Sequence, residues 1–269
     1  MEIRTSKDSD WEVFLRWTRR EGWRVPAQEL ELYRGPLAGS AFVLRADGEV
    51  RGLVTAVSHE RSGWVGNLIV PAAYRGRGYG GLLFDHATDV LERRGAQGIW
   101  LTASVLGHPI YEKRGFQTID SVVRWVRRDS PPSGGAKPTA RPEALFREDA
   151  RVWGESRRGL LEPLARRGRV LTCGQSVALL QEGVDFQVFG PWSSQEFCPR
   201  ENRLLLAAAL DSCEREELVA DVLKSSPMGQ LLTAAGFVAQ GECRLMAKGP
   251  ATPPGQRGLV ALASLGSMG

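Results

Sequence analysis

The spacing of apolar residues changes repeatedly along the first half of the chain, and it predicts alternating strands and helices. Residues 9–20 carry apolar side chains at the spacing of one helix face, with Ser6 or Asp8 as a cap. Two β-rich runs are separated by Asp47-Gly48, a strong signal for a tight hairpin. In chain order the pattern predicts a strand at 2–5, helices at 9–20 and 26–33, strands at 40–45, 49–59 and 64–70, a helix at 78–94, a strand at 98–103, a helix at 108–114, and strands at 116 and 121–127.

The second half repeats the end of this order. Each half contains a short amphipathic helix followed by a Gly-Phe pair and a strand, at Gly115-Phe116 and at Gly236-Phe237. This echo favours a diverged internal duplication. The apolar tail at 258–269 is expected to dock as a last strand of the second fold. The other predicted elements are strands at 169–172, 177–180 and 185–189, a helix at 196–215, a strand at 218–223, a helix at 228–235 and a strand at 237–247.

Residues 129–142 separate the two halves and have the composition of a linker. The segment reads DSPPSGGAKPTARP, with four prolines, two glycines and no large apolar residue. Such a stretch cannot contribute to a core, and it predicts an extended connection. We therefore expect two domains, at 1–128 and 143–269, rather than one large domain.

The composition is that of an ordinary globular protein. Of 269 residues, 42% are hydrophobic and 25% are charged, which is enough for a core without disulfides or metals. The net charge of +4 is dispersed, so we expect no nucleic-acid partner. The apolar run at 204–210 is too short to span a membrane, the four cysteines lack metal-binding spacing, and MEIRTSKDSD is no secretory signal. We expect a cytoplasmic protein with reduced thiols, no metal and no membrane partner.

One segment has the pattern of an anion-binding site. Residues 68–81 read LIVPAAYRGRGYGG, a strand followed by a glycine-rich loop and a helix. Gly76, Gly78 and Gly80 permit a tight turn and keep side chains away from amides that can face a phosphate at a helix start. The loop is neither a P-loop nor a dinucleotide-binding fingerprint, because the required residues and spacing are missing. Judged on the loop alone, a tight connection without a ligand is an equal alternative.

Two motifs in register resemble the GNAT acetyltransferase superfamily. Residues 75–80 match R-x-x-G-x-G, the acetyl-CoA pyrophosphate loop of that family, and residues 111–116 read YEKRGF, similar to its later Y-x-K-x-G-F. The resemblance covers roughly residues 2–128 in element order. It implies a mixed α/β sheet of the GNAT fold, in two tandem copies of which the second is degenerate. It also implies an enzyme that transfers acetyl from acetyl-CoA to a primary amine of a small molecule or a protein, by direct attack in a ternary complex.

The resemblance assigns a cofactor site. In this family the pantetheine arm pairs with exposed backbone between two parted parallel strands, here at Leu68, Ile69 and Val70. Ser104 stands where many members have an asparagine that contacts the pantetheine, so this contact is shorter or lost. The residues expected to hold the pyrophosphate on their amides are Arg75, Gly76, Arg77, Gly78, Tyr79 and Gly80, with Gly81 beginning the helix.

The resemblance also assigns catalytic roles. Tyr111 is expected to protonate the departing CoA thiolate as a general acid, the alternative being a tyrosine that only hydrogen-bonds the sulfur. Many members carry a glutamate on the strand before the loop, but this chain has Gly66 at that position. His59, Glu60 and His108 are therefore the candidates for a base acting through water. An amine that loses its proton to a water chain needs no dedicated base.

The acceptor groove is expected to be lined by helices 9–20 and 26–33. Its aromatic residues can hold an amine or belong to the core, and its acidic residues can attract a cationic amine or form an ordinary solvated face. These residues are Trp11, Trp17, Trp23, Tyr33 and Trp64, and Glu21, Glu29 and Glu31.

The second half lacks the glycine-rich motif. The sequence FGPWSS at 189–194 stands where the loop is expected, with Pro191 lacking an amide donor and Trp192 obstructing a phosphate. We expect no acetyl-CoA there, and two roles stay open for this half, covering the acceptor groove or providing a homodimer surface. The alternative to an enzyme is a non-catalytic acyl-CoA-binding or regulatory module, favoured by the missing carboxylate and by Ser104.

Overall fold

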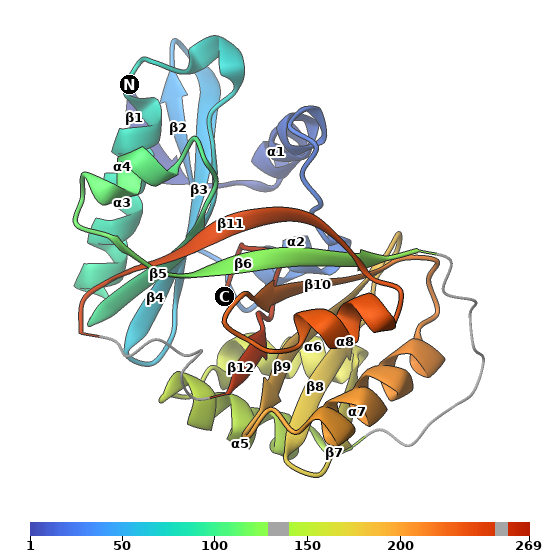
Figure 1. Cartoon of the computed structure of the whole chain (residues 1–269). Helices are drawn as coiled ribbons and strands as arrows, with labels where there is room; N and C mark the ends of the chain where they lie inside the picture. Colours follow the sequence, from blue (N-terminus) through green and yellow to red (C-terminus); the bar gives the residue numbers. More distant parts are fainter. Residues whose placement is uncertain (129–139, 251–257) are drawn as a thin grey trace.

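Strands from both halves of the chain form one mixed sheet of twelve strands among the residues that the computed structural model describes, 1–128, 140–250 and 258–269 (Figure 1). The strand order is β1-β2-β3-β4-β5-β11-β6-β10-β12-β9-β8-β7. The numbering rises from one edge, mixes in the middle and falls toward the other edge. The two halves of the chain therefore meet at the centre of the sheet.

The first half has the element order that its hydrophobic pattern predicts. Asp47 and Gly48 both have positive φ, 54° and 77°, which is the conformation of the expected hairpin turn. The predicted cap of the first helix is wrong, because Asp10 accepts a 2.7 Å hydrogen bond from the Lys7 amide instead. The elements are β1 (Glu2–Thr5), α1 (Asp8–Arg20), α2 (Ala27–Arg34), β2 (Ala41–Ala46), β3 (Glu49–Ser58), β4 (Ser62–Ile69), the 3-10 turn η1 (Ala72–Tyr74), α3 (Tyr79–Arg93), β5 (Gly98–Ala103), α4 (His108–Glu112) and β6 (Gln117–Arg127).

The second half repeats this order more completely than its sequence pattern indicates. Two helices that the pattern missed, α5 and α6, stand where α1 and α2 stand in the first half. Pro142 begins α5 and is not part of a linker, while residues 129–139 lie outside the described residues. The elements are α5 (Pro142–Trp153), α6 (Arg158–Arg167), β7 (Arg169–Cys173), β8 (Ser176–Gln181), β9 (Gln187–Ser194), α7 (Pro199–Ser212), β10 (Leu218–Leu223), α8 (Gly229–Ala234), β11 (Val238–Lys248) and β12 (Leu259–Ala261).

The two halves exchange strands at the centre of the sheet. Strand β11 of the second half lies between β5 and β6 of the first half and pairs antiparallel with both. In return, β6 pairs antiparallel with β10 of the second half. Figure 1 shows β6 and β11 crossing the middle of the molecule together. Each half thus supplies a long strand to the other half's part of the sheet.

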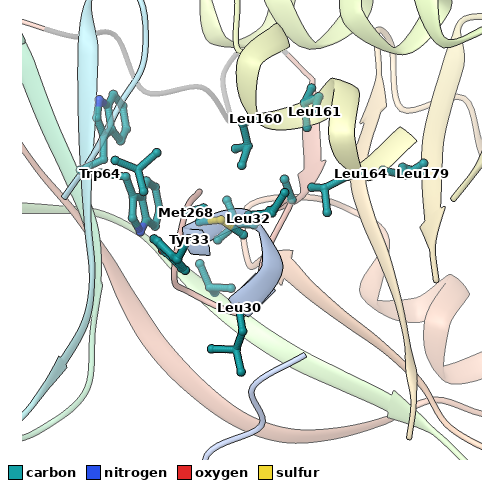
Figure 2. Close-up of a cluster of buried hydrophobic side chains, with 14 of the residues drawn as sticks. Leu30, Leu32, Tyr33, Trp64, Leu160, Leu161, Leu164, Leu179 and Met268 are labelled. Atoms are coloured by element: carbon teal, nitrogen blue, oxygen red, sulfur yellow. The ribbon is translucent and has the colours of Figure 1, made fainter. Parts of the chain in front are cut away.

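One hydrophobic core is shared by the two halves, while each half has a further core on the other face of the sheet. The shared core contains side chains of α1, α2, α5, α6, β4 and β8, together with Met268 near the end of the chain. Figure 2 shows Leu32 and Tyr33 of α2 beside Met268, with the leucines of α6 on the same side of α2. The separate cores lie under α3 and α4 in the first half and under α7 and α8 in the second.

The apolar tail does dock as a strand, and it does so inside the sheet. Strand β12 pairs antiparallel with β9 on one side and with β10 on the other. Strands β9 and β10 pair directly, in parallel, only at Gln187–Leu218 and Val188–Val219. The residues after β12 then reach the first half, where the Trp64 indole donates a 3.1 Å hydrogen bond to the Gly266 carbonyl.

Candidate active site

Strands β4 and β5 part in the middle of the first half. They pair in parallel only from Ser62 to Trp64, opposite Gly98 to Trp100. Beyond Trp64, β4 bulges away, because Asn67 has a φ of 52° and the register with β3 shifts there. The edge of β4 that faces β5 has no ladder partner from Val65 to Ile69 within the described part of the chain. Its backbone donors and acceptors are open to a ligand that lies between the strands.

The glycine-rich loop connects this bulged strand to helix α3. Gly76 and Gly78 have φ values of 77° and 80°, in the left-handed region that favours glycine, and Gly78 is the N-cap of α3. A Cβ atom at either position would meet nothing within 4 Å, so the loop presents bare backbone. The first amides of a helix have no intrahelical partner and carry the positive end of its dipole. Together these features are those expected of an anion-binding site.

The two arginines of the loop are held differently. The Arg75 side chain turns back, donating a 2.9 Å hydrogen bond to the Val70 carbonyl and a 2.5 Å one to Glu21. Arg77 lies over the Tyr74 ring, 5.6 Å from its centroid. A third arginine, Arg114, pairs with Asp85 and lies 2.8 Å from where a Cβ on Gly81 would be. Arg75 is therefore already paired by a carboxylate, and Gly81 leaves room for Arg114.

Tyr111 lies on the α3 side of the parted strands. It is 7% exposed and packs against Phe84 with ring centroids 4.7 Å apart. Burial raises the pKa of its phenol to about 12, so the hydroxyl keeps its proton at neutral pH. Within the described residues this hydroxyl has no hydrogen-bond partner. Ser104 lies close by, and its hydroxyl accepts a 3.2 Å hydrogen bond from the Gly107 amide, which fixes the turn before α4.

A cavity of about 310 Å³ extends between the parted strands. Tyr111 and Val65 belong to the core on the α3 side, whereas Glu29 lies on α2 on the opposite side. The cavity therefore connects the two faces of the sheet, and both halves of the chain contribute to its wall. From the first half it is lined by residues 22–25, Glu29, residues 65–68, Thr102, Ser104, Tyr111, Val122 and Arg124, and from the second half by Asp221, residues 240–243 and residues 265–267.

The base candidates predicted from sequence do not line this cavity. His59 follows β3 and faces Trp153 of α5, with ring centroids 6.4 Å apart. The Glu60 carboxylate accepts a 3.0 Å hydrogen bond from the Ser156 amide. His108 faces Glu112 on its own helix at 3.6 Å. The geometry therefore favours none of the three as a base for an amine that binds in the cavity with Tyr111.

Most of the aromatic residues expected in the acceptor groove belong to the core. Trp11 stacks on Tyr33 with centroids 5.1 Å apart, and Trp64 is fully buried. Trp17 packs against the same shared core, and only Trp23 of this set lines the cavity. Helical periodicity places an aromatic residue on the apolar face of a helix, but it does not show whether that residue packs in the core or lines a groove. The packing in the structure makes this distinction.

The three acidic candidates separate clearly. Glu21 pairs with Arg75 and Glu31 with Arg167, both at the surface. Glu29 is 4% exposed, lines the cavity and accepts a 2.7 Å hydrogen bond from the Ser267 hydroxyl. Burial raises the pKa of Glu29 to about 7, and the Ser267 hydrogen bond and Arg124 lower it by less.

Several cavity residues gave no signal in the sequence. Arg124 of β6 binds Asp221 of β10 through two hydrogen bonds of 2.8 and 2.7 Å, and it also donates to the Leu265 carbonyl at 3.1 Å. These contacts exist only because the halves exchange strands and the tail crosses to the first half. The local hydrophobic pattern of the sequence predicts neither the strand exchange nor the path of the tail.

In the second half, the place equivalent to the anion site is closed. The predicted position of the missing loop is wrong, because residues 189–194 lie inside β9 and α7 begins at Pro199. Pro199 offers no amide, and the Glu201 carboxylate in the first turn accepts a 2.9 Å hydrogen bond from the Gln175 amide. Strand β12 fills the gap between β9 and β10 that corresponds to the gap between β4 and β5.

The described residues contain no group of three or more His, Cys, Asp or Glu side chains placed to hold a metal ion. In the same part of the chain, no helix is long and apolar enough to cross a membrane.

Comparison with known proteins bears on the family model that the chain matches and on its fold. Residues 7–116 match the model of the Acetyltransferase (GNAT) family. An acetyltransferase from Pyrococcus horikoshii is similar in structure over 100% of this chain and 95% of its own, with 20% identity and a TM-score of 0.81. A GCN5-related N-acetyltransferase from Sphaerobacter thermophilus is similar over 94% and 98%, with 16% identity and a TM-score of 0.67. No curated protein matches the chain in sequence.

These similarities confirm the tandem GNAT fold, since they extend over both halves and not only over the matched domain.

Proposed function

We propose that the protein is an acetyl-CoA-dependent N-acetyltransferase with one active site per chain, in the first half. The observation that carries this proposal is the combination of an open β4 edge, a bare helix start and Tyr111 around one cavity. The pantetheine pairs with Leu68, Ile69 and Val70, and the pyrophosphate binds the amides from Arg75 to Gly81. Ser104 lies beside the arm, with its hydroxyl committed to Gly107.

Tyr111 acts as the general acid of the reaction. Attack by an amine on the thioester carbon releases a thiolate, and a positioned phenol can supply the proton it needs. A phenol with a pKa of about 12 is protonated throughout the neutral range, so it is a donor and not a base. Backbone amides of the bulged β4 strand can polarise the thioester oxygen.

The second half builds part of the acceptor site and binds no acetyl-CoA of its own. It supplies Asp221, a segment of β11 and the tail to the cavity wall, while its own strand gap is filled by β12. Calorimetry should therefore give one CoA per chain.

The test is thiol release from acetyl-CoA over a panel of primary amines. The panel includes glucosamine, because a glucosamine N-acetyltransferase region of a fungal multi-domain GH3 β-N-acetylglucosaminidase has a similar fold, at 15% identity and a TM-score of 0.64. Tyr111→Phe should lower kcat about 10²-fold or more without weakening CoA binding. Tyr74→Phe, which removes a half-buried hydroxyl bound by Arg51 outside the cavity, is the matched control.

The same assay distinguishes an acetyltransferase from the alternative, a non-catalytic module. A non-catalytic acyl-CoA-binding module binds CoA but releases no thiol with any amine, and Tyr111→Phe then changes nothing.

A further inference from the structure

We propose that Glu29 binds the acceptor as a small primary ammonium ion and is the catalytic base that deprotonates it. The inference rests on the proposed acetyl transfer and names its missing base and its substrate class. The acceptor is an amine without an acidic group of its own, small enough for a cavity of about 310 Å³.

The charges around the cavity single out Glu29. Asp221 is bound by Arg124 at 2.7 Å, and Glu242 is bound by Lys224 at 3.0 Å. Arg24, the other cation of the wall, pairs with Glu217. Among the charged residues of the cavity wall in the described part of the chain, Glu29 alone has no ion-pair partner, and its hydrogen bonds come from Ser267 and the Leu265 backbone. Arg124, the cation whose charge acts on Glu29, is paired with Asp221. A buried carboxylate without an ion pair of its own favours a cationic ligand.

The position of Glu29 fits a base that works opposite Tyr111. The cavity passes through the sheet between β4 and β5, with Tyr111 on the α3 side and Glu29 on the α2 side. A thioester held along β4 lies between them. The amine then approaches from the Glu29 side, and the sulfur leaves toward Tyr111.

The tail explains why the base stands on a helix and not on β4. A Cβ atom on Gly66 would lie 2.2 Å from the Ser267 carbonyl oxygen, so no side chain fits there. The same residue, Ser267, donates its hydroxyl to Glu29. The tail thus excludes a carboxylate at position 66 and orients one from α2 toward the cavity.

The proposed reaction transfers protons through Glu29 and Tyr111. Glu29 takes one proton from the ammonium ion, and the neutral nitrogen forms a C–N bond to the thioester carbon. The C–S bond breaks, the sulfur takes the proton of Tyr111, and the phenolate regains a proton from the acylated nitrogen. The products are an amide and free CoA thiol, and Glu29 returns its proton to water.

The titration of Glu29 depends on a defined set of neighbours. Burial and the nearby carboxylate of Asp221 raise the pKa of Glu29, whereas Ser267, Arg124 and the Leu265 amide lower it. The other titratable groups are Glu31, Tyr33 and Arg34 on its helix, and Tyr111, Arg24, Glu242 and Cys243 in the cavity wall.

The test compares Glu29→Gln with Glu31→Gln, a control two residues further along α2 that pairs with Arg167 at the surface. With the best amine of the panel, Glu29→Gln should lower kcat/KM about 10²-fold or more. It should also remove the acidic limb of the pH profile, whose midpoint we expect near pH 7 in the wild type from the raised pKa of Glu29. Glu31→Gln should keep both the rate and the limb. Calorimetry should give the same CoA affinity for all three proteins.

Ser267→Ala provides a second measurement that retains the carboxylate. Loss of a hydrogen bond that stabilises the charged form should move the acidic limb to higher pH. This variant decides the matter if Glu29→Gln does not fold. A wild-type rate and pH profile in Glu29→Gln, or an unmoved limb in Ser267→Ala, overturns the Glu29 proposal while the acetyl transfer stands. If the wild type binds CoA and acetylates no amine, the proposed function fails, and this inference fails with it.

Discussion

The Ser267 hydroxyl donates a 2.7 Å hydrogen bond to the Glu29 carboxylate, joining residues that are 238 positions apart in the chain. This contact brings the tail of the second half against α2 of the first half. In the described structure Glu29 is buried and has no ion pair, so its ionisation should make the free energy of unfolding depend on pH.

The free energy of unfolding should fall as the pH rises from the ordinary pKa of Glu29 in the unfolded chain to its raised pKa in the folded protein. The pKa of this carboxyl is raised from 4.5 to about 7, so between these values the folded state holds a proton that the unfolded state has lost. The free energy of unfolding should therefore decrease by up to about 3 kcal/mol between about pH 4.5 and about pH 7 through this group. Glu29→Gln should remove this decrease and should be more stable than the wild type above pH 7, as measured by urea unfolding. Equal pH dependence in Glu29→Gln and the control Glu31→Gln contradicts it.

His59 should have the opposite effect in acid. Burial, and then the charge of Arg157, lower the pKa of His59 to about 3, so the unfolded state takes up a proton near pH 6.5 that the folded state refuses. Stability from this group is complete above about pH 6.5 and is lost as the pH falls toward about 3. His59→Gln should flatten the acid side of the stability curve. His108→Gln, which alters a contact with Glu112 on the same helix, is the matched control.

Gly78 should be needed for full CoA affinity, because of both its conformation and its missing side chain. Its φ of 80° disfavours any other residue, and a Cβ here would project into the open space in front of the helix start. Gly95 has a similar φ of 89° and equally open space but lies after α3, at the far end of that helix. Ala at either position should cost about 1 kcal/mol of stability.

Only Gly78→Ala should weaken CoA binding, by about tenfold, in calorimetry. If the two variants bind CoA equally well, the pyrophosphate does not bind at this helix start.

The sequence predicts the parts of the site that are local. The loop at 75–81 and Tyr111 are recognisable because each depends on residues within one turn or one helix. Helix α5 is not predicted, although Leu145, Asp149 and Val152 are buried at helix spacing, because the linker composition takes in Pro142, which instead begins the helix.

The acceptor side could not be predicted from the sequence in the same way. Arg124 meets Asp221 across the β6–β10 pair, and Ser267 meets Glu29 through the crossing tail. Both contacts follow from the order of strands in the sheet, which hydrophobic periodicity does not encode. Glu29 lies three and four residues before Leu32 and Tyr33, on the buried face of α2, whereas Glu31 lies on the exposed face. Helical spacing therefore separates the two glutamates, but it does not show that Glu29 lines a cavity.

Gly66→Ala should displace the tail. The added methyl carbon would lie 2.2 Å from the Ser267 carbonyl oxygen and 2.8 Å from its carbonyl carbon, and neither backbone atom can rotate away. Gly241→Ala is the matched control, because it also lies in a strand beside the cavity and its Cβ would meet nothing within 4 Å. We expect Gly66→Ala to cost about 1–3 kcal/mol and to lower Tm accordingly, with Gly241→Ala near the wild type.

Displacement of the tail should also free the Trp64 indole, which donates to the Gly266 carbonyl at 3.1 Å, and expose the segment after β12 to protease. Limited proteolysis followed by mass spectrometry should therefore cut Gly66→Ala near its C-terminal end before it cuts Gly241→Ala. The pH limb assigned to Glu29 should move upward in the same variant, because its Ser267 partner is lost. If Gly66→Ala has the Tm, cleavage pattern and pH profile of the control, the tail does not hold Glu29 in place.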